Sequence, residues 1–225
     1  MLAEEEQHEH PAQMVTQVQN PRGWFGRLNL SAMNRRHSKL TDWGLKHIST
    51  ERHFTILDLG CGGGRTVSKL TELAPEGKTY GIDHSEESVA VSRRTNKKWI
   101  EMGRVEIRRD SVSRLPFADK MFDLATAIET HFYWPDLPAD MQEVRRVLKP
   151  GGTLIIIAEA YKGGKHDQLL QRLVDAMEST ATPYSHLSVE EHRDLLSRAG
   201  CSDVQVFEEH EKGWICTIGR KPSSS

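Results

Sequence analysis

The stretch Phe54-Thr-Ile-Leu-Asp-Leu-Gly-Cys-Gly-Gly-Gly-Arg-Thr66 decides the fold. An apolar, β-prone run ends at an acid, glycines follow in a tight turn, and a helical pattern with one apolar face begins at once. Glycines permit positive φ and close backbone approach, because they carry no Cβ atom. A buried strand that leads through such a turn into a helix N-terminus predicts a binding place for a nucleotide-like ligand.

The spacing of the glycines narrows the class of ligand. Gly60, Gly62 and Gly64 read G-x-G-x-G, with Asp58 two residues ahead. The dinucleotide fingerprint is G-x-G-x-x-G, and Arg65 stands where its third glycine belongs, which argues against a nicotinamide-dependent oxidoreductase. A phosphate-binding P-loop would end in Gly-Lys-Ser/Thr, which this turn lacks. The structural alternative is a glycine turn that only connects strand to helix.

The motif acid-x-G-x-G-x-G at residues 58–64 resembles the class I S-adenosylmethionine-dependent methyltransferases. Residues 115–123 (LPFADKMFD) and 143–152 (EVRRVLKPGG) resemble the branch of that family that methylates small molecules, including quinone precursors and sterols. The resemblance spans residues 52–220. It implies an α/β, Rossmann-like, doubly wound and mostly parallel seven-stranded sheet with an antiparallel last strand. It also implies S-adenosylmethionine as cofactor and in-line SN2 methyl transfer to a small-molecule acceptor, releasing S-adenosylhomocysteine.

The resemblance also implies which residues hold the cofactor. Asp83 lies about 20 residues beyond the glycines, where an acid at a strand end accepts hydrogen bonds from ribose hydroxyls. Capping of the next helix is the alternative role for Asp83. In the family an acid at the position of Asp110 hydrogen-bonds the adenine amino group. The expected cofactor-binding residues are Asp58, Gly60, Cys61, Gly62, Asp83, His84, Asp110, Ser111, Val112, Ile128 and Glu129.

The run Glu129-Thr-His-Phe-Tyr-Trp-Pro135 follows the fourth expected strand, where the ligand crevice of a doubly wound sheet opens. His131 is the candidate general base, because its pKa is near working pH, and Glu129 is the second catalytic candidate. A structural hydrogen bond or a cofactor contact is the alternative for His131. The family signature for attack by planar nitrogens, Asn/Asp-Pro-Pro-Tyr, is absent here. The expected substrate-pocket residues are Trp24, His37, Phe132, Tyr133, Trp134 and Tyr161.

The chain divides into four parts by composition. Residues 1–20 are polar and predict a flexible tail, and residues 21–50 carry apolar helical positions. We weigh a substrate lid and fixed packing equally for this second segment. Residues 51–220 form the expected methyltransferase domain, in which residues 85–102 predict one long helix, and residues 221–225 predict a frayed tail.

The bulk properties exclude several classes of function. The 225 residues carry a formal net charge of −2, which provides no strong field for nucleic acid or acidic membranes. No apolar run is long enough to span a bilayer, and the acidic start argues against a signal peptide. Three scattered cysteines without metal-ligand spacing predict a reducing, cytoplasmic setting and no disulfide framework. No metal is expected, because the Asp/Asn cluster of catechol-type methyltransferases is also not apparent. RNA or protein methylation, cofactor binding without catalysis, and monomer or homodimer remain open.

Overall fold

The computed structural model describes residues 38–168, 171, 175 and 184–223. The expected tail 1–20, Trp24 and His37 lie outside the described residues, as does most of the segment 21–50. Among the residues described, no helix is long and apolar enough to cross a membrane.

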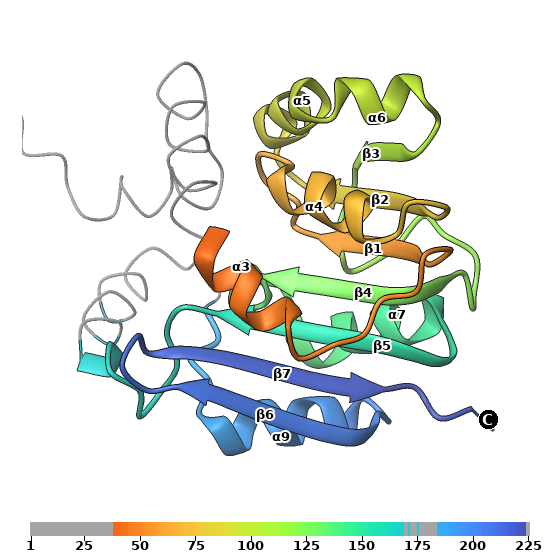
Figure 1. Cartoon of the computed structure of the whole chain (residues 1–225). Coiled ribbons are helices and arrows are strands. Elements are labelled where there is room, and N and C mark those ends of the chain that lie inside the picture. Colours follow the sequence, from red (N-terminus) through yellow and green to blue (C-terminus); the bar gives the residue numbers. More distant parts are fainter. Residues whose placement is uncertain (1–37, 169–170, 172–174, 176–183, 224–225) are drawn as a thin grey trace, which may run out of the picture.

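A seven-stranded sheet runs through the molecule in the order β3-β2-β1-β4-β5-β7-β6 (Figure 1). The strands are β1 (Thr55–Leu59), β2 (Lys78–Asp83), β3 (Val105–Arg109), β4 (Phe122–Ile128), β5 (Leu148–Ala158), β6 (Ser202–Glu209) and β7 (Trp214–Arg220). β1 to β5 pair in parallel, whereas β7 is antiparallel to both β5 and β6. The expected fold class, with its antiparallel last strand, is confirmed.

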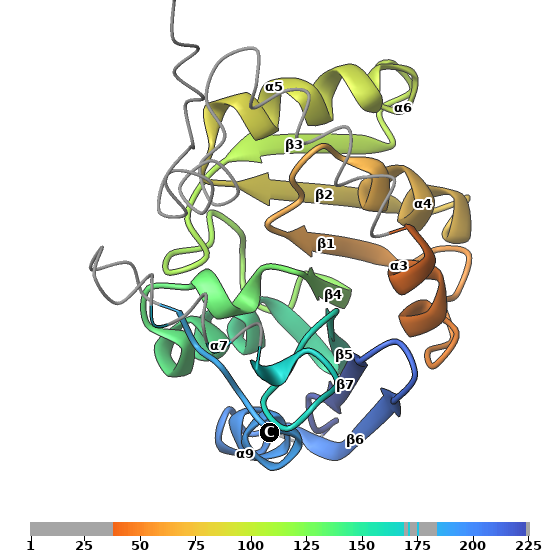
Figure 2. The ribbon, with the colours of Figure 1, turned by 90° about the vertical axis from the view of Figure 1, so that its left-hand side faces the viewer.

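Helices cover both faces of this sheet (Figures 1 and 2). On one face, α3 (Ser38–Leu45) packs on β5 and β7, α4 (Arg65–Leu73) on β1 and β2, and α5 (Glu86–Thr95) on β2 and β3. On the other face, α7 (Leu137–Val147) packs on β5, and α9 (Val189–Arg198) on β6 and β7. This two-sided cover explains why the central strands read as continuous apolar runs.

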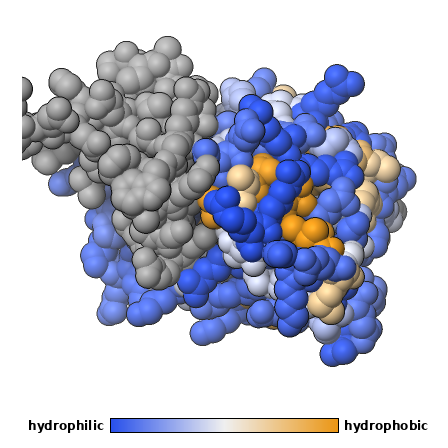
Figure 3. Space-filling view, turned by 90° about the horizontal axis from the view of Figure 1, so that it is seen from above, coloured by the Kyte–Doolittle hydropathy of each residue, from blue (hydrophilic) through white to orange (hydrophobic). Residues whose placement is uncertain are grey.

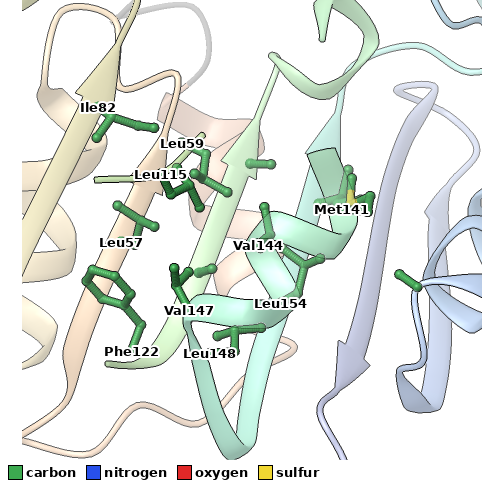
Figure 4. Close-up of a cluster of buried hydrophobic side chains, with 14 of the residues drawn as sticks. Leu57, Leu59, Ile82, Leu115, Phe122, Met141, Val144, Val147, Leu148 and Leu154 are labelled. Atoms are coloured by element: carbon green, nitrogen blue, oxygen red, sulfur yellow. The ribbon is translucent and has the colours of Figure 1, made fainter. Parts of the chain in front are cut away.

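The hydrophobic core follows the alternation of side chains along each strand. In β5, Leu154 and Ile156 join the cluster beneath α7, together with Met141 and Val144 of that helix (Figure 4). Their neighbours in sequence, residues 155 and 157, join the cluster beneath α3 and α4 on the opposite face. The sheet is thus packed on both faces, and the strand ends from which the carboxyl-edge loops start are fixed by this packing.

The helix expected over residues 85–102 is two helices, α5 and α6 (Lys97–Glu101), separated at Asn96. The side-chain amide of Asn96 donates hydrogen bonds to the carbonyl oxygens of Gly64 (2.8 Å) and Ser92 (2.9 Å). Asn96 therefore ends α5 where that helix touches the glycine turn. The single-helix prediction was wrong because this long-range contact leaves no periodic signal.

Lys221 corrects the expectation of a frayed tail over 221–225. Its residue is only 6% exposed, and its ammonium donates hydrogen bonds to the carbonyl oxygens of Arg145 (2.8 Å) and Leu148 (2.8 Å). The last carbonyls of a helix have no partner within the helix and attract a cation. Lys221 therefore fastens the end of β7 to the end of α7.

The β3 edge of the sheet shows an apolar patch framed by charged side chains (Figure 3). Ile100, the buried Val105 and Ile107, and the charged Arg93 and Lys97 line a hollow at this edge. These residues lie on α5, α6 and β3.

Candidate active site

The glycine turn between β1 and α4 takes a backbone path that only glycine adopts without strain. Gly60, Gly62 and Gly64 have φ values of 70°, 49° and 79°. A Cβ atom at Gly60 would lie 2.2 Å from the Thr130 hydroxyl oxygen, whereas a Cβ atom at Gly62 would meet nothing within 4 Å. The turn is therefore packed against Thr130 on one side and has open space beside Gly62.

The end of α5 locks the far side of this turn. A Cβ atom at Gly64 would lie 2.3 Å from the Ser92 hydroxyl oxygen and 2.5 Å from the Asn96 side-chain nitrogen. Because Asn96 is fully buried and also bonds the Gly64 carbonyl, the turn is held before any ligand arrives. Such preorganisation lowers the ordering cost of ligand binding.

Asp83, at the end of β2, ties the turn to the second strand. One carboxylate oxygen accepts from the Gly62 N–H (2.9 Å), and the other accepts from the Ser85 N–H (2.9 Å). Burial raises the pKa of Asp83, although both N–H donors oppose that effect. The helix cap itself is Ser85, whose hydroxyl oxygen accepts from Ser88 N–H. A carboxylate has about four acceptor positions, so Asp83 keeps capacity for a ligand.

Asp58, at the end of β1, is a buried acid with one oxygen unused. It is 2% exposed, and its Oδ1 accepts from the Thr126 hydroxyl at 2.6 Å. Its Oδ2 is buried without a hydrogen-bond partner. Burial raises the pKa of Asp58 to about 7, and the nearby Asp83 charge adds to that rise. Within the described part of the chain, no lysine or arginine pairs with either acid, so the pair favours a cationic ligand.

The remaining strand ends continue this edge of the sheet. The Asp110 N–H donates to the Asp83 carbonyl (3.1 Å), and the Asp110 carboxylate accepts from Ser111 N–H (3.0 Å). Glu129 bridges β4 to β5, because its N–H donates to Ile157 (2.9 Å) and its carboxylate accepts from the Glu159 N–H. Glu129 has a φ of 57°, a left-handed conformation that typically costs about 1–3 kcal/mol and clusters at functional sites.

Other expected cofactor residues take lesser positions at this edge. Cys61 is buried in the turn and its N–H donates to the Ile82 carbonyl at 2.8 Å. The exposed His84 ring lies 3.8 Å from an Asp83 oxygen. Val112 and Ile128 are partly buried against the two core clusters.

The aromatic residues after β4 separate into two groups. Phe132 lies with Tyr133 (ring centroids 4.6 Å apart) and Tyr184 (5.1 Å), and Tyr161 belongs to the same apolar cluster. Tyr161 donates its hydroxyl hydrogen to Glu208 at 2.6 Å. Trp134 instead packs in the core beneath α7. Its indole N–H donates to the Thr130 hydroxyl oxygen (3.3 Å), which holds Thr130 against Gly60.

His131 is the most deeply buried of the expected catalytic residues, at 1% exposure. Its Nε2 lies 3.1 Å from Nε2 of His192 on α9, and its buried Nδ1 has no hydrogen-bond partner in the described part of the chain. Burial holds the pKa of His131 well below its usual value, and His192 lowers it further, so the imidazole is neutral. Sequence reasoning missed His192, Thr130 and Asn96, because no motif marks them.

Residues 57–156 match the family model for the methyltransferase domain. The chain is 28% identical over 176 residues to the methyltransferase GfsG of Streptomyces halstedii, covering 77% of this chain and 62% of that protein. It is 30% identical over 134 residues to a demethylmenaquinone methyltransferase of Geobacillus kaustophilus, covering 59% of this chain and 57% of that protein. The chain thus spans about three-fifths of the length of these curated relatives.

Solved structures share the fold. A SAM-dependent methyltransferase from Aquifex aeolicus superposes with a TM-score of 0.68 at 21% identity, covering 87% of this chain and 98% of that one. The [4+2]-cyclase SpnF superposes with a TM-score of 0.64 at 20% identity, covering 82% and 80% of the two chains. Because the second protein is a cyclase by name, the shared fold does not by itself fix the reaction.

The sheet order, the glycine turn and the acids at neighbouring strand ends agree with the arrangement expected of a Rossmann-like protein that binds S-adenosylmethionine. The methyltransferase domain matched at residues 57–156 and the methyltransferase relatives support a class I S-adenosylmethionine-dependent methyltransferase. The resemblance on which the sequence was interpreted is thereby confirmed, and S-adenosylmethionine is the cofactor of that family.

Proposed function

We propose that this protein transfers a methyl group from S-adenosylmethionine to a small-molecule acceptor. The observation that carries the proposal is the acidic glycine turn. Asp58 and Asp83 are buried beside it, and within residues 38–168 and 184–223 Asp58 Oδ2 has no partner and the space beside Gly62 is open. Two buried acids would repel the pyrophosphate of a dinucleotide, whereas they favour the ammonium and sulfonium groups of S-adenosylmethionine.

The chain offers matching groups along the whole cofactor. In this proposal Asp58 Oδ2 accepts from the ammonium of the methionine part, directly or through water, and the open side of Gly62 allows close approach. The free acceptor capacity of Asp83 takes the ribose hydroxyls. Asp110, which neighbours Asp83 through a backbone hydrogen bond, takes the adenine amino group.

When bound, S-adenosylmethionine supplies an electrophilic methyl group. The contribution of the protein is to align the acceptor and to exclude water, since methyl transfer depends mainly on orientation. His131 is the proposed general base, because its neutral ring carries an unused nitrogen at the carboxyl end of β4. Glu129 holds the same strand end in its strained conformation.

The acceptor is proposed to be a small molecule with an apolar part. The cluster of Phe132, Tyr133, Tyr161 and Tyr184 supports this, because it gathers aromatic surface beside the proposed base. The name of one curated relative, a demethylmenaquinone methyltransferase, agrees with this class, and the other is named only as a methyltransferase. The segment 21–50 as a lid and a cytoplasmic location belong to the same proposal.

The test has two stages. Calorimetry should show saturable binding of S-adenosylmethionine and S-adenosylhomocysteine, and no comparable binding of a nicotinamide dinucleotide. Incubation with methyl-labelled donor and fractionated cell extracts should then place the label in the small-molecule fraction. Label in RNA or protein would show that the acceptor is a macromolecule and not a small molecule. Donor binding without any methyl transfer would indicate a non-catalytic binding protein and overturn the enzymatic proposal.

A further inference from the structure

Two buried histidines from distant parts of the chain meet next to the proposed acceptor site. His131 follows β4, and His192 lies on α9, 61 residues further along. Their Nε2 atoms are 3.1 Å apart, which is a hydrogen bond if one nitrogen carries a proton and the other does not. The direction of that bond decides which nitrogen of His131 is basic.

The backbone of α9 settles the direction. His192 Nδ1 lies 2.8 Å from the carbonyl oxygen of Ser188, and a carbonyl only accepts, so Nδ1 carries the proton. Burial lowers the pKa of both histidines, so each ring is neutral and has one N–H. His192 Nε2 is therefore an acceptor, and His131 Nε2–H donates to it.

These two hydrogen bonds leave Nδ1 of His131 without a proton, so its lone pair can accept one. Among the residues that the structure describes, that buried atom has no hydrogen-bond partner. An unsatisfied buried acceptor typically costs about 1–3 kcal/mol, so its persistence calls for a reason. The neighbouring residues give one, since Phe132 lies 5.1 Å from the His131 ring and belongs to the proposed acceptor cluster.

We infer that His192 is a positioning residue that fixes the tautomer of His131 and so presents Nδ1 to the O–H or N–H group of the methyl acceptor. Ser188 is the N-cap of α9, and its carbonyl oxygen determines the direction of both hydrogen bonds. The capping box that Ser188 forms with Glu191 fixes the start of the helix. The inference rests on the proposed function. It assigns a role in the reaction to α9, far from the glycine turn in sequence.

The proton and electron balance is simple. The acceptor group gives its proton to His131 Nδ1, and its freed lone pair forms the bond to the methyl carbon. The carbon–sulfur bond breaks with its electron pair remaining on sulfur, which becomes the neutral thioether of S-adenosylhomocysteine. His131, now protonated at both nitrogens, then releases the Nδ1 proton to water.

The test compares two variants, each of which keeps one of the two hydrogen bonds that the His192 side chain makes. In His192→Gln the amide oxygen can take the place of Nε2 and accept from His131, whereas His192→Asn keeps the bond to Ser188 but does not reach His131. Long-range proton–nitrogen correlation spectra of protein with labelled histidine report each tautomer directly. We expect wild type and His192→Gln to show His131 protonated at Nε2 alone, and His192→Asn to show both tautomers.

The spectra also separate the two proposals. A wild-type His131 protonated at Nδ1, or a single unchanged tautomer in His192→Asn, would overturn the inference whatever the enzyme does. In the labelled-methyl assay we expect His192→Asn to lose at least tenfold in kcat at unchanged donor affinity, and His192→Gln to restore most of it. Equal kcat in all three proteins would remove His192 from the reaction. Failure of wild type to bind the donor would overturn the proposed function and the role of Nδ1 in methyl transfer, whereas the tautomer assignment would still be decided by the spectra.

Discussion

Two glycines with similar backbones and different surroundings allow a test of the glycine turn at the scale of one residue. Gly62 and Gly103 have φ values of 49° and 71°, and a Cβ atom at either meets nothing within 4 Å. Alanine at each site should therefore cost a similar strain of about 1–2 kcal/mol. We expect Gly62→Ala to weaken binding of S-adenosylmethionine at least tenfold in calorimetry, and Gly103→Ala, after α6, to leave it unchanged. Equal affinities would mean that the cofactor does not approach Gly62.

Asp58 predicts a pH dependence of cofactor binding. Its pKa is raised to about 7, so below about pH 7 the carboxyl is largely protonated, and a cationic ligand must drive that proton off. Affinity for S-adenosylmethionine should rise from about pH 5 to about pH 7, by up to about tenfold per unit for one linked proton. Calorimetry in buffers of different ionisation enthalpy should detect the released proton. Asp58→Asn should reduce the slope, and an identical slope would assign the proton elsewhere.

The same linkage acts on the folded protein without ligand. Because the folded-state pKa of Asp58 lies above its unfolded value, the folded state holds a proton that the unfolded chain has lost. This contribution to stability is complete below the unfolded pKa of about 4 and is lost as the pH rises through about 7. The charged, buried carboxylate of Asp58 therefore lowers the free energy of unfolding at higher pH, and a bound cationic cofactor offsets this loss.

At this scale the sequence revealed the acids but not their partners. Asp58 and Asp83 stand at fixed distances from glycines, so their positions at strand ends could be inferred from spacing. Thr126, Asn96 and His192 contact site residues that lie 68, 32 and 61 positions away in the chain. Such contacts depend on the completed sheet and leave no local pattern in the sequence.

Among the elements, the parallel strands were predictable because each is an apolar run bounded by turn residues. The division into α5 and α6 was not predictable, because Asn96 ends α5 and donates a hydrogen bond to the distant glycine turn. Lys221 likewise belongs to the cap of α7 rather than to a tail. Both deviations are polar side chains that satisfy backbone carbonyls of another element.

Asn96 gives the prediction at the scale of elements. Asn96→Ala leaves the buried Gly64 carbonyl without its side-chain donor, which should lower the free energy of unfolding by about 1–3 kcal/mol. Thr95→Ala is the matched control, since Thr95 also donates to a carbonyl one turn back, at Val91, but does not touch the glycine turn. Denaturant titration should separate the two, and Asn96→Ala should also weaken cofactor binding. Equal losses in both variants would show that α5 does not support the turn.

For the whole molecule, the arrangement of the site follows from the order of the sheet. β1 lies between β2 and β4, so the glycine turn, Asp83 and the run from Glu129 meet at one edge, although the sequence separates them. The carboxyl ends of parallel strands are where open α/β sheets bind ligands. The sequence could place this edge once the fold was inferred, but the contact of α9 with His131 through His192 depends on the three-dimensional packing.

Binding at this edge should stabilise the sheet as a unit. A ligand at 100 times its Kd that binds only the folded state adds about 2.7 kcal/mol, and domains of about 150–250 residues gain about 2–4 °C in Tm per kcal/mol. We therefore expect saturating S-adenosylmethionine to raise the Tm by about 5–10 °C, because the glycine turn and the ends of β1, β2 and β4 must unfold together for the ligand to leave. Differential scanning calorimetry measures this at one fixed ligand concentration, with Gly103→Ala as the variant that should keep the shift and Gly62→Ala as the one that should lose about half of it or more. If Gly62→Ala keeps the full shift in Tm, the ligand binds away from the glycine turn. The ligand would then not hold together the strand ends that meet at this edge of the sheet.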